Sequence, residues 1–354
     1  MNTQSMRSTN LARTPDQRME HLIAKHTGLD EIVEGKARVT GCLANGYAPL
    51  GYLLADFTLI RHQGTFHLFH IPRVPGHRPI LRCHEHWIGH AVSQDLDTWT
   101  TLNPALCVEP SNHFESGHVW APFVIEHEGV HCMFYTGLSD EPSQSICLAV
   151  ARDPDLASWE RSAENPITPL EGFDWHWRNR FGHARHARDP HVVRVGDHFL
   201  LAYTTMHADG CPAVGGLVST DMRKWEDIGP MLFRPVPPAS WHPESVNIQP
   251  LPDGTWTMIP SATPGLEYYI STDPYHWHGL TATPIRYADE STKPLVGIEV
   301  LARDDEAGLW VVAYFEGNGV DRLFIGTLDL HESPWTLRRV RSAPELDRWQ
   351  GLLG

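Results

Sequence analysis

Short apolar stretches separated by glycine turns recur along the chain from about residue 46 onward. The clearest example begins at Asp189, turns at Gly196 and continues through a second apolar stretch to Tyr203. Two such stretches around a tight turn are typical of a β-hairpin. Comparable turns, each followed by a stretch rich in aromatic residues, start at Gly64, Gly129, Gly196, Gly254 and Gly308.

A second mark follows each hairpin, in which an aspartate precedes a tryptophan by a few residues. The pairs are Asp95 and Trp99, Asp153 and Trp159, Asp221 and Trp225, Asp273 and Trp277, and Asp329 and Trp335. We expect each aspartate to accept backbone N–H groups in a turn and each tryptophan to pack between repeats. Five units of four strands predict an all-β, five-bladed β-propeller over residues 46–345, followed by a C-terminal tail at 346–354.

Residues 1–45 show a different pattern of apolar positions, which predicts an N-terminal extension that contains a helix. Thr14 is a candidate helix cap, and Pro15 suits the first helical position. Gln17 lies three residues after Thr14, which is the spacing of a capping box. Apolar residues at helical spacing continue the pattern as far as Ile32 and Val33. The sequence therefore predicts a short helical extension that packs outside the propeller.

The composition limits the classes of function. The net charge of −15, without a basic run, argues against nucleic acid as a partner. No apolar run reaches about 18 residues and the N-terminus has no apolar signal core, so we expect no membrane association and a cytoplasmic location. The six cysteines form no C-x-x-C pair, which predicts buried free thiols. We expect neither a cofactor nor a metal, and the oligomeric state stays open.

Three acids occupy similar places in different repeats. Aligning the first strand of each unit puts Asp56, Ala121, Asp189, Glu244 and Ile298 at equivalent positions. The innermost strands of a propeller line its central channel, so these acids should converge at one mouth of it. Repulsion and partial burial should raise at least one pKa, and glycoside hydrolysis needs a protonated acid beside an ionised one. The alternative is that each acid only caps a turn.

Further side chains could line the same pocket, although packing roles are equally open for each. They are Arg188, Trp120, His242, His118, Glu115, Trp175 and Glu299. We also expect two long loops, at 165–187 and 229–243, to wall off a pocket for a small oligosaccharide.

The chain resembles the five-bladed β-propeller glycoside hydrolases of families 32, 43, 68 and 117. The resemblance is carried by Arg188-Asp189-Pro190, by the segment from Ile88 to Trp99, and by Trp120-Ala121-Pro122. It implies that Asp56 is the nucleophile, or the water-activating base of an inverting enzyme. It further implies that Asp189 orients sugar hydroxyls while Arg188 holds it ionised, and that Glu244 is the general acid.

The resemblance favours a β-fructofuranosidase-like hydrolase, because the Arg-Asp-Pro motif is that of the fructofuranosidase group. Asp56 is followed by Phe57-Thr58 rather than Pro-Asn, and Glu244 by Ser245-Val246 rather than Cys-Pro. An inverting exo-glycosidase on arabinose, xylose or anhydro-galactose units is therefore a second hypothesis. A carbohydrate-binding propeller without catalysis is a third, and a metal-dependent lactonase-type hydrolase a fourth.

Overall fold

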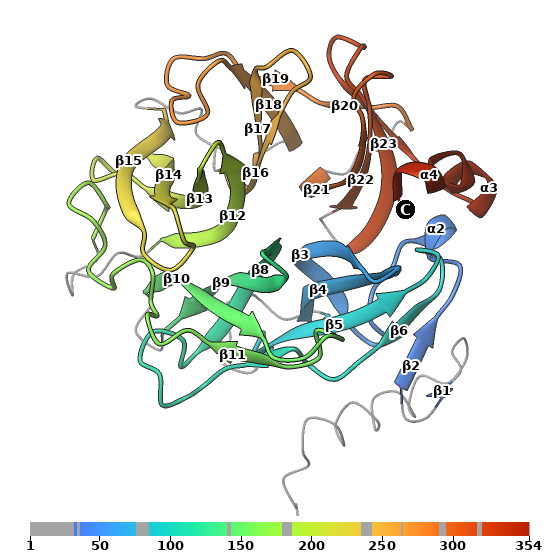
Figure 1. Ribbon diagram of the computed structural model, residues 1–354, viewed down its shortest axis with the longest axis horizontal. Helices are drawn as coiled ribbons and strands as arrows, with labels where there is room; N and C mark the ends of the chain where they lie inside the picture. The colour runs from blue at the N-terminus through green and yellow to red at the C-terminus, as the bar shows by residue number, and fades with distance from the viewer. Residues whose placement is uncertain are drawn as a thin grey trace, which may run out of the picture.

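Five β-sheets surround one central axis in the computed structural model (Figure 1). It describes residues 32–33, 36–75, 85–139, 143–178, 186–234, 243–262, 265–289, 295–316 and 321–353. Each sheet is one blade with four main antiparallel strands, and consecutive blades follow the chain around the ring. The predicted all-β, five-bladed propeller is confirmed.

The two inner strands of each blade form the predicted hairpins. The strands nearest the axis are β3 (Leu53–His62), β8 (His118–His127), β12 (Ala187–Val195), β16 (Glu244–Pro250) and β21 (Leu295–Asp304). Their hairpin partners are β4 (Thr65–Arg73), β9 (Val130–Leu138), β13 (His198–Met206), β17 (Trp256–Ala262) and β22 (Leu309–Glu316). These partner strands are buried along most of their length because blades pack on both of their faces.

The two outer strands complete each blade. The third strands are β5 (Trp87–Ser93), β10 (Gln144–Ala151), β14 (Pro212–Ser219), β18 (Gly265–Ser271) and β23 (Arg322–Asp329). The fourth are β6 (Trp99–Thr101), β11 (Trp159–Arg161), β15 (Glu226–Phe233), β19 (Thr283–Pro284) and β24 (Thr336–Arg339). Short additional strands pair at the edges: β7 (Leu106–Cys107) with β5, and β20 (Arg286–Tyr287) with β24. The loop expected from residue 229 onward begins inside β15, so that part of the loop prediction is wrong.

The aspartate–tryptophan turns have the structure that the sequence predicts. In blade three, Asp221 Oδ1 accepts the backbone N–H groups of Arg223 at 2.8 Å and Lys224 at 2.9 Å. The indole N–H of Trp225 donates to the carbonyl of Met222 at 3.1 Å, and the ring packs edge-on against Phe134 of blade two. These aspartates therefore close turns, and the tryptophans join neighbouring blades.

The segment before residue 46 takes part in the first blade. Strand β2 (Lys36–Val39) pairs with β6, and β1 (Ile32–Val33) pairs with β2. The helix expected from Thr14 lies outside the described residues up to its last part, where Ile32 and Val33 form a strand instead of helix. An exposed sheet edge offers unpaired backbone groups, and pairing with β6 satisfies them.

Blades one and five close the ring. The backbone of Tyr47, after the short helix α2 (Cys42–Asn45), exchanges two hydrogen bonds of 2.8 Å with Leu323 of β23. One apolar core combines side chains from both blades, and Leu346 and Leu353 join it. Leu346 ends the helix α3 (Ala343–Leu346), and Leu353 ends the helix α4 (Gln350–Leu353). The short 3-10 helix η1 (Asp347–Trp349) lies between them. The predicted tail therefore packs on the propeller.

Two smaller expectations concern the cysteines and the membrane. No disulfide joins two of the five described cysteines. Cys211 is only partly buried, and Cys107 is exposed because it lies on the short edge strand β7. Cys83 lies outside the described residues. Within the described ranges, no helix combines the length and the apolar character needed to cross a bilayer.

Candidate active site

The pairing of each innermost strand is interrupted near its start, at the same point in all five blades. The extra residues fall at Asp56, Ala121–Pro122, Asp189–Pro190, Ser245–Val246 and Gly297. Ala121, Asp189 and Ser245 have positive φ angles of 42°, 57° and 45°. A bulge bends the strand and re-aims its side chains, which is common beside functional sites.

The bulges correct the repeat alignment. Glu244 pairs with Ser261 just before the interruption, as Arg188 pairs with Thr204 and Trp120 with Thr136. The structural equivalent of Asp56 and Asp189 in blade four is therefore Ser245, and in blade five it is Gly297. The alignment of Glu244 and Ile298 with those two acids was wrong by one residue, because the sequence does not reveal where the extra residue is inserted.

One cavity of about 320 Å³ nevertheless collects the three acids of the sequence hypothesis. Its lining residues are Asp56, Ile71, Arg73, Glu85, Trp120, Gln144, His186, Arg188, Asp189 and Glu244. These residues come from the first four blades, and several of them lie near the starts of β3, β12 and β16. The structure thus brings together Asp56, Asp189 and Glu244 with Arg188 and Trp120.

Asp56 is held from blade four. The hydroxyl of Ser245 donates to Asp56 Oδ1 at 2.7 Å. Burial raises the pKa of Asp56, and the charge of Glu244 acts in the same direction, while the Ser245 hydrogen bond and the guanidinium groups of Arg73 and Arg188 lower it. The carboxyl group therefore has a fixed orientation and lies within the field of two cations.

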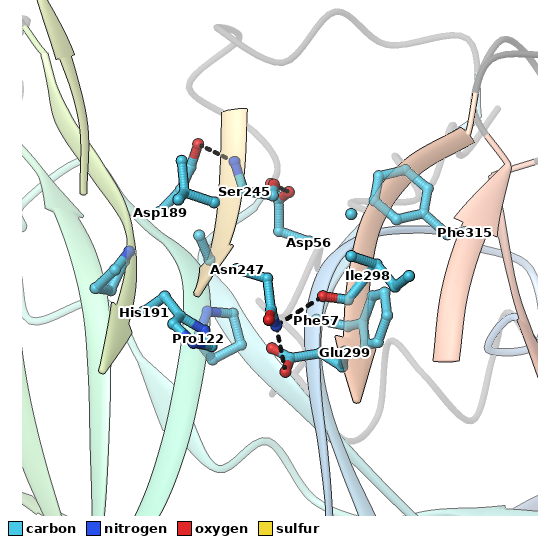
Figure 2. Close-up of a pocket in the computed structure, with 14 residues that line it drawn as sticks. Asp56, Phe57, Pro122, Asp189, His191, Ser245, Asn247, Ile298, Glu299 and Phe315 are labelled. Atoms are coloured by element: carbon cyan, nitrogen blue, oxygen red, sulfur yellow. Dashed lines mark hydrogen bonds between the residues drawn. The ribbon is translucent and has the colours of Figure 1, made fainter. Parts of the chain in front are cut away.

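Asp189 and Glu244 share the guanidinium group of Arg188. Arg188 lies 3.0 Å from Glu244 Oε1 through one terminal nitrogen, and its Nε lies 3.5 Å from Asp189 Oδ2. Asp189 also accepts the backbone N–H of Ser245 at 3.1 Å (Figure 2). Burial raises the pKa of Asp189 to about 7, and the opposing charge of Arg188 does not outweigh it. Glu244 is more exposed than Asp189, with half of its side chain accessible to solvent.

A second, much smaller cavity of about 30 Å³ lies along the axis beside Asp56 and Asp189 (Figure 2). It shares Asp56 and Asp189 with the first cavity and reaches Asn247 and Glu299 farther along the inner strands. Asn247 donates to the carbonyl of Ile298 at 3.0 Å and approaches Glu299 Oε2 at 3.4 Å. Burial raises the pKa of Glu299 to about 8. Glu299 therefore lies deeper in the channel than Asp56, Asp189 and Glu244.

Three other candidates do not line either cavity. Trp175 packs in the core between blades two and three, and its indole N–H donates to Asp227 at 2.9 Å. His118 is buried, with its ring against those of Trp120 and His86. Glu115 is buried and accepts the hydroxyl of Tyr135 at 2.7 Å. The expectation that Trp175 walls the pocket is wrong, because the loop turns it toward Tyr203. His242 lies outside the described residues.

The sequence hypothesis missed an ion pair in the cavity wall. Arg73 Nε lies 3.2 Å from Glu85 Oε1, and both residues line the cavity. Burial raises the pKa of Glu85 to about 7, and the Arg73 charge opposes that shift. Arg73 ends the second strand of blade one and Glu85 precedes the third, so a search of every strand end at this face would have found them. Ser245 was missed because it became recognisable only once the bulge was located.

The comparison with known families identifies the chain. The sequence model described as the glycosyl hydrolases family 32 N-terminal domain matches residues 48–292. The chain belongs to glycoside hydrolase family 32. A probable sucrose-6-phosphate hydrolase of Psychromonas ingrahamii is 26% identical over 50% of this chain and 30% of its own length. An insoluble β-fructofuranosidase isoenzyme of Arabidopsis thaliana is 27% identical over 48% of this chain and 32% of its own length. The chain thus spans about a third of these curated relatives.

Solved structures show the same fold. Sucrose-6-phosphate hydrolase from Lactobacillus gasseri aligns with a TM-score of 0.66 at 15% identity, covering 92% of this family 32 chain and 66% of its own. A variant of the Bombyx mori family 32 β-fructofuranosidase in complex with sucrose aligns at 0.63 with 16% identity, covering 92% and 70%. A thermostable family 43 glycoside hydrolase aligns at 0.61 with 15% identity, covering 81% and 93%. The predicted resemblance to this group of propeller hydrolases is confirmed.

Proposed function

We propose that this family 32 protein hydrolyses the glycosidic bond of a small β-fructofuranoside with retention of configuration. One observation carries the proposal: carboxyl groups from blades one, three and four line one cavity at the mouth of the channel. Asp189 is buried, Asp56 is partly buried and Glu244 is half-exposed. Retaining hydrolysis uses one carboxylate as the nucleophile and a second carboxyl group as the proton donor, and we assign Asp56 and the more exposed Glu244 to these two roles.

The roles follow from the surroundings of each acid. Asp56, oriented by Ser245, attacks the anomeric carbon as the ring oxygen shares the developing positive charge. Glu244, at the open side, donates a proton to the departing oxygen, so that the bond breaks and a glycosyl–enzyme ester forms. Glu244 then takes a proton from water, which attacks the same carbon and releases Asp56. Asp189 accepts hydrogen bonds from sugar hydroxyls, and Arg188 fixes its position relative to Glu244.

The proposed partner is a small oligosaccharide of the sucrose type. Two findings support it: relatives are described as sucrose-6-phosphate hydrolase and β-fructofuranosidase, and a structural neighbour was solved with sucrose. Trp120 offers an aromatic face at the cavity wall, suited to stacking on a sugar ring. The cytoplasmic location stays a prediction.

A panel of glycosides tests the proposal. The protein should release fructose from sucrose, and proton NMR should show the β-anomer of fructofuranose first. Glu244→Gln should lose most turnover of sucrose but keep more activity on a fructoside whose leaving group needs no protonation. Release of arabinose, xylose or anhydro-galactose without release of fructose would contradict the proposed substrate, and first appearance of the α-anomer would contradict the retaining course.

A further inference from the structure

The ion pair of Arg73 and Glu85 has no part in the bond-breaking steps, yet it lies in the cavity that holds them. Only 2% of the Glu85 side chain is exposed, against 28% for Arg73. Arg73, Glu85 and the proposed nucleophile Asp56 line the same cavity. The charge of Arg73 lowers the pKa of Asp56, and the charge of Asp56 raises the pKa of Glu85. The ion pair therefore lines the cavity in which the proposed reaction takes place.

The backbone at Glu85 is unusual. Its φ angle is 63°, in the left-handed region that side chains other than glycine rarely adopt. Its carbonyl accepts the backbone N–H of Val119 in β8 at 3.3 Å, which ties blade one to blade two at this point. Conformations of this kind persist where the surroundings impose them, and they are frequent at ligand sites. The left-handed turn places a carboxyl group where an ordinary strand start would not.

The charges of the cavity are unbalanced. Its described lining carries four carboxyl groups, on Asp56, Glu85, Asp189 and Glu244, against two guanidinium groups. Three carboxylates still face the two guanidinium groups when Glu244 holds the proton that it donates and the pH is above 7, the approximate pKa of Asp189 and Glu85. Both guanidinium groups already have carboxyl partners: Arg188 contacts Glu244 and Asp189, and Arg73 contacts Glu85. A phosphorylated substrate would add negative charge to this set, and juxtaposed like charges discriminate strongly against a ligand.

We propose that Arg73 and Glu85 form a substrate-positioning pair that selects a neutral sugar over a phosphorylated one. Glu85 accepts hydrogen bonds from sugar hydroxyls while Arg73 donates to a neighbouring oxygen, and together they present no net charge to the ligand. The inference rests on the proposed hydrolysis and narrows its substrate class: the chain acts on sucrose in preference to sucrose 6-phosphate, although relatives of both descriptions exist.

The test compares kcat/KM for sucrose and for sucrose 6-phosphate, at pH 8 to keep Glu85 mostly ionised. The wild-type protein should prefer sucrose by roughly tenfold or more. Glu85→Gln leaves Arg73 without its carboxyl partner, so the preference for sucrose should shrink by roughly tenfold, because a charged hydrogen bond to the phosphate becomes available. A purely structural role of Glu85 would lower both values alike and leave their ratio unchanged.

Two further variants make the result specific. The double variant Arg73→Gln/Glu85→Gln removes both charges and should restore the wild-type preference. Asp305→Asn is the matched control: it takes the carboxyl from Arg303, 3.0 Å away at the opposite end of β21, and should leave the ratio unchanged. Melting temperatures of all variants show whether each has folded.

The outcomes separate this inference from the proposed function. A wild-type preference for sucrose 6-phosphate, or an unchanged ratio in a folded Glu85→Gln variant, overturns the inference alone. If the wild-type protein cleaves neither sugar, the proposed function fails, and calorimetric binding of the same two sugars then decides the inference by the same ratio.

Discussion

Asp56 and Asp189 occupy the same bulge position in blades one and three, yet their contacts differ. Asp56 accepts a side-chain hydroxyl, whereas Asp189 accepts a backbone N–H and lies beside a guanidinium group. Ser245 makes both contacts, through its hydroxyl and its backbone nitrogen. One residue of blade four thus sets the relative position of the acids from the other two blades.

Asp56→Asn tests the nucleophile. An amide of the same shape keeps the fold but cannot form the ester intermediate, so kcat for sucrose should fall by roughly 10³-fold or more. Fructose release with a melting curve measures both effects. The control is Asp197→Asn, on an exposed hairpin turn between β12 and β13, which should retain full activity. Activity within tenfold of wild type in Asp56→Asn would assign the nucleophile elsewhere.

Ser245→Ala tests how Asp56 is kept ionised. The Ser245 hydrogen bond lowers the pKa of Asp56, so its removal should raise that pKa. Because the ionised form attacks, the acid limb of the pH profile of kcat/KM should move to higher pH. An acid limb at the wild-type position would show that the hydroxyl does not influence the nucleophile.

The aspartate–tryptophan turns contribute to the stability of the blades and not to catalysis at the candidate active site. Asp221 accepts two backbone N–H groups that would otherwise lack partners in the turn before β15. Asp221→Ala should lower the free energy of unfolding by about 1 kcal/mol, in line with the loss of ordinary hydrogen bonds, and leave kcat unchanged. Urea denaturation and a sucrose assay measure the two quantities. A large loss of activity without loss of stability would contradict the purely structural role.

The strands themselves were largely predictable, because glycine turns and aspartate–tryptophan pairs repeat in the sequence of every blade. The sequence could not locate the bulges, since an inserted residue leaves the apolar pattern of the strand nearly unchanged. That ambiguity explains the misplacement of Glu244 and the omission of Ser245. Arg73 and Glu85 could have been noticed as charged residues at strand ends, but their pairing could not be predicted, because β4 and β5 are joined through residues that carry no repeat signal. Ile32 and Val33 suit either a helix or a strand, and the open edge of β2, which itself pairs with β6, favours a strand.

At the scale of the whole molecule, neutral histidines are buried between the blades. His67 and His90 lie between the first two blades, with ring nitrogens 3.1 Å apart, and burial lowers their pKa values to about 4 and about 3. In the unfolded chain both would titrate near pH 6.5. The unfolded state therefore binds more protons below that pH, and stability present above about pH 6.5 is lost as the pH falls toward 4.

His90→Phe tests this linkage. The substitution keeps an aromatic ring against Phe69, which lies 4.4 Å from the His90 ring, and removes the group that protonates on unfolding. Between pH 7 and pH 5 the variant should lose about 2 kcal/mol less stability than the wild-type protein. Denaturation curves at the two pH values give the difference, with His198→Gln on the exposed end of β13 as the control. Equal losses in His90→Phe and wild type would contradict the linkage.

Ring closure links the site to the fold as a whole. The acids converge only because β3, β12 and β16 keep fixed positions around one axis, and the contacts of Tyr47 with Leu323 hold the first and last blades together. Within this ring, Asp56 should form a covalent ester with the fructosyl group. Rapid quenching of Glu244→Gln with an activated fructoside, followed by peptide mass spectrometry, detects that ester. We expect one hexosyl adduct on the peptide that carries Asp56. An adduct on another residue, or turnover with an inverted product and no adduct, would show that Asp56 is not the nucleophile.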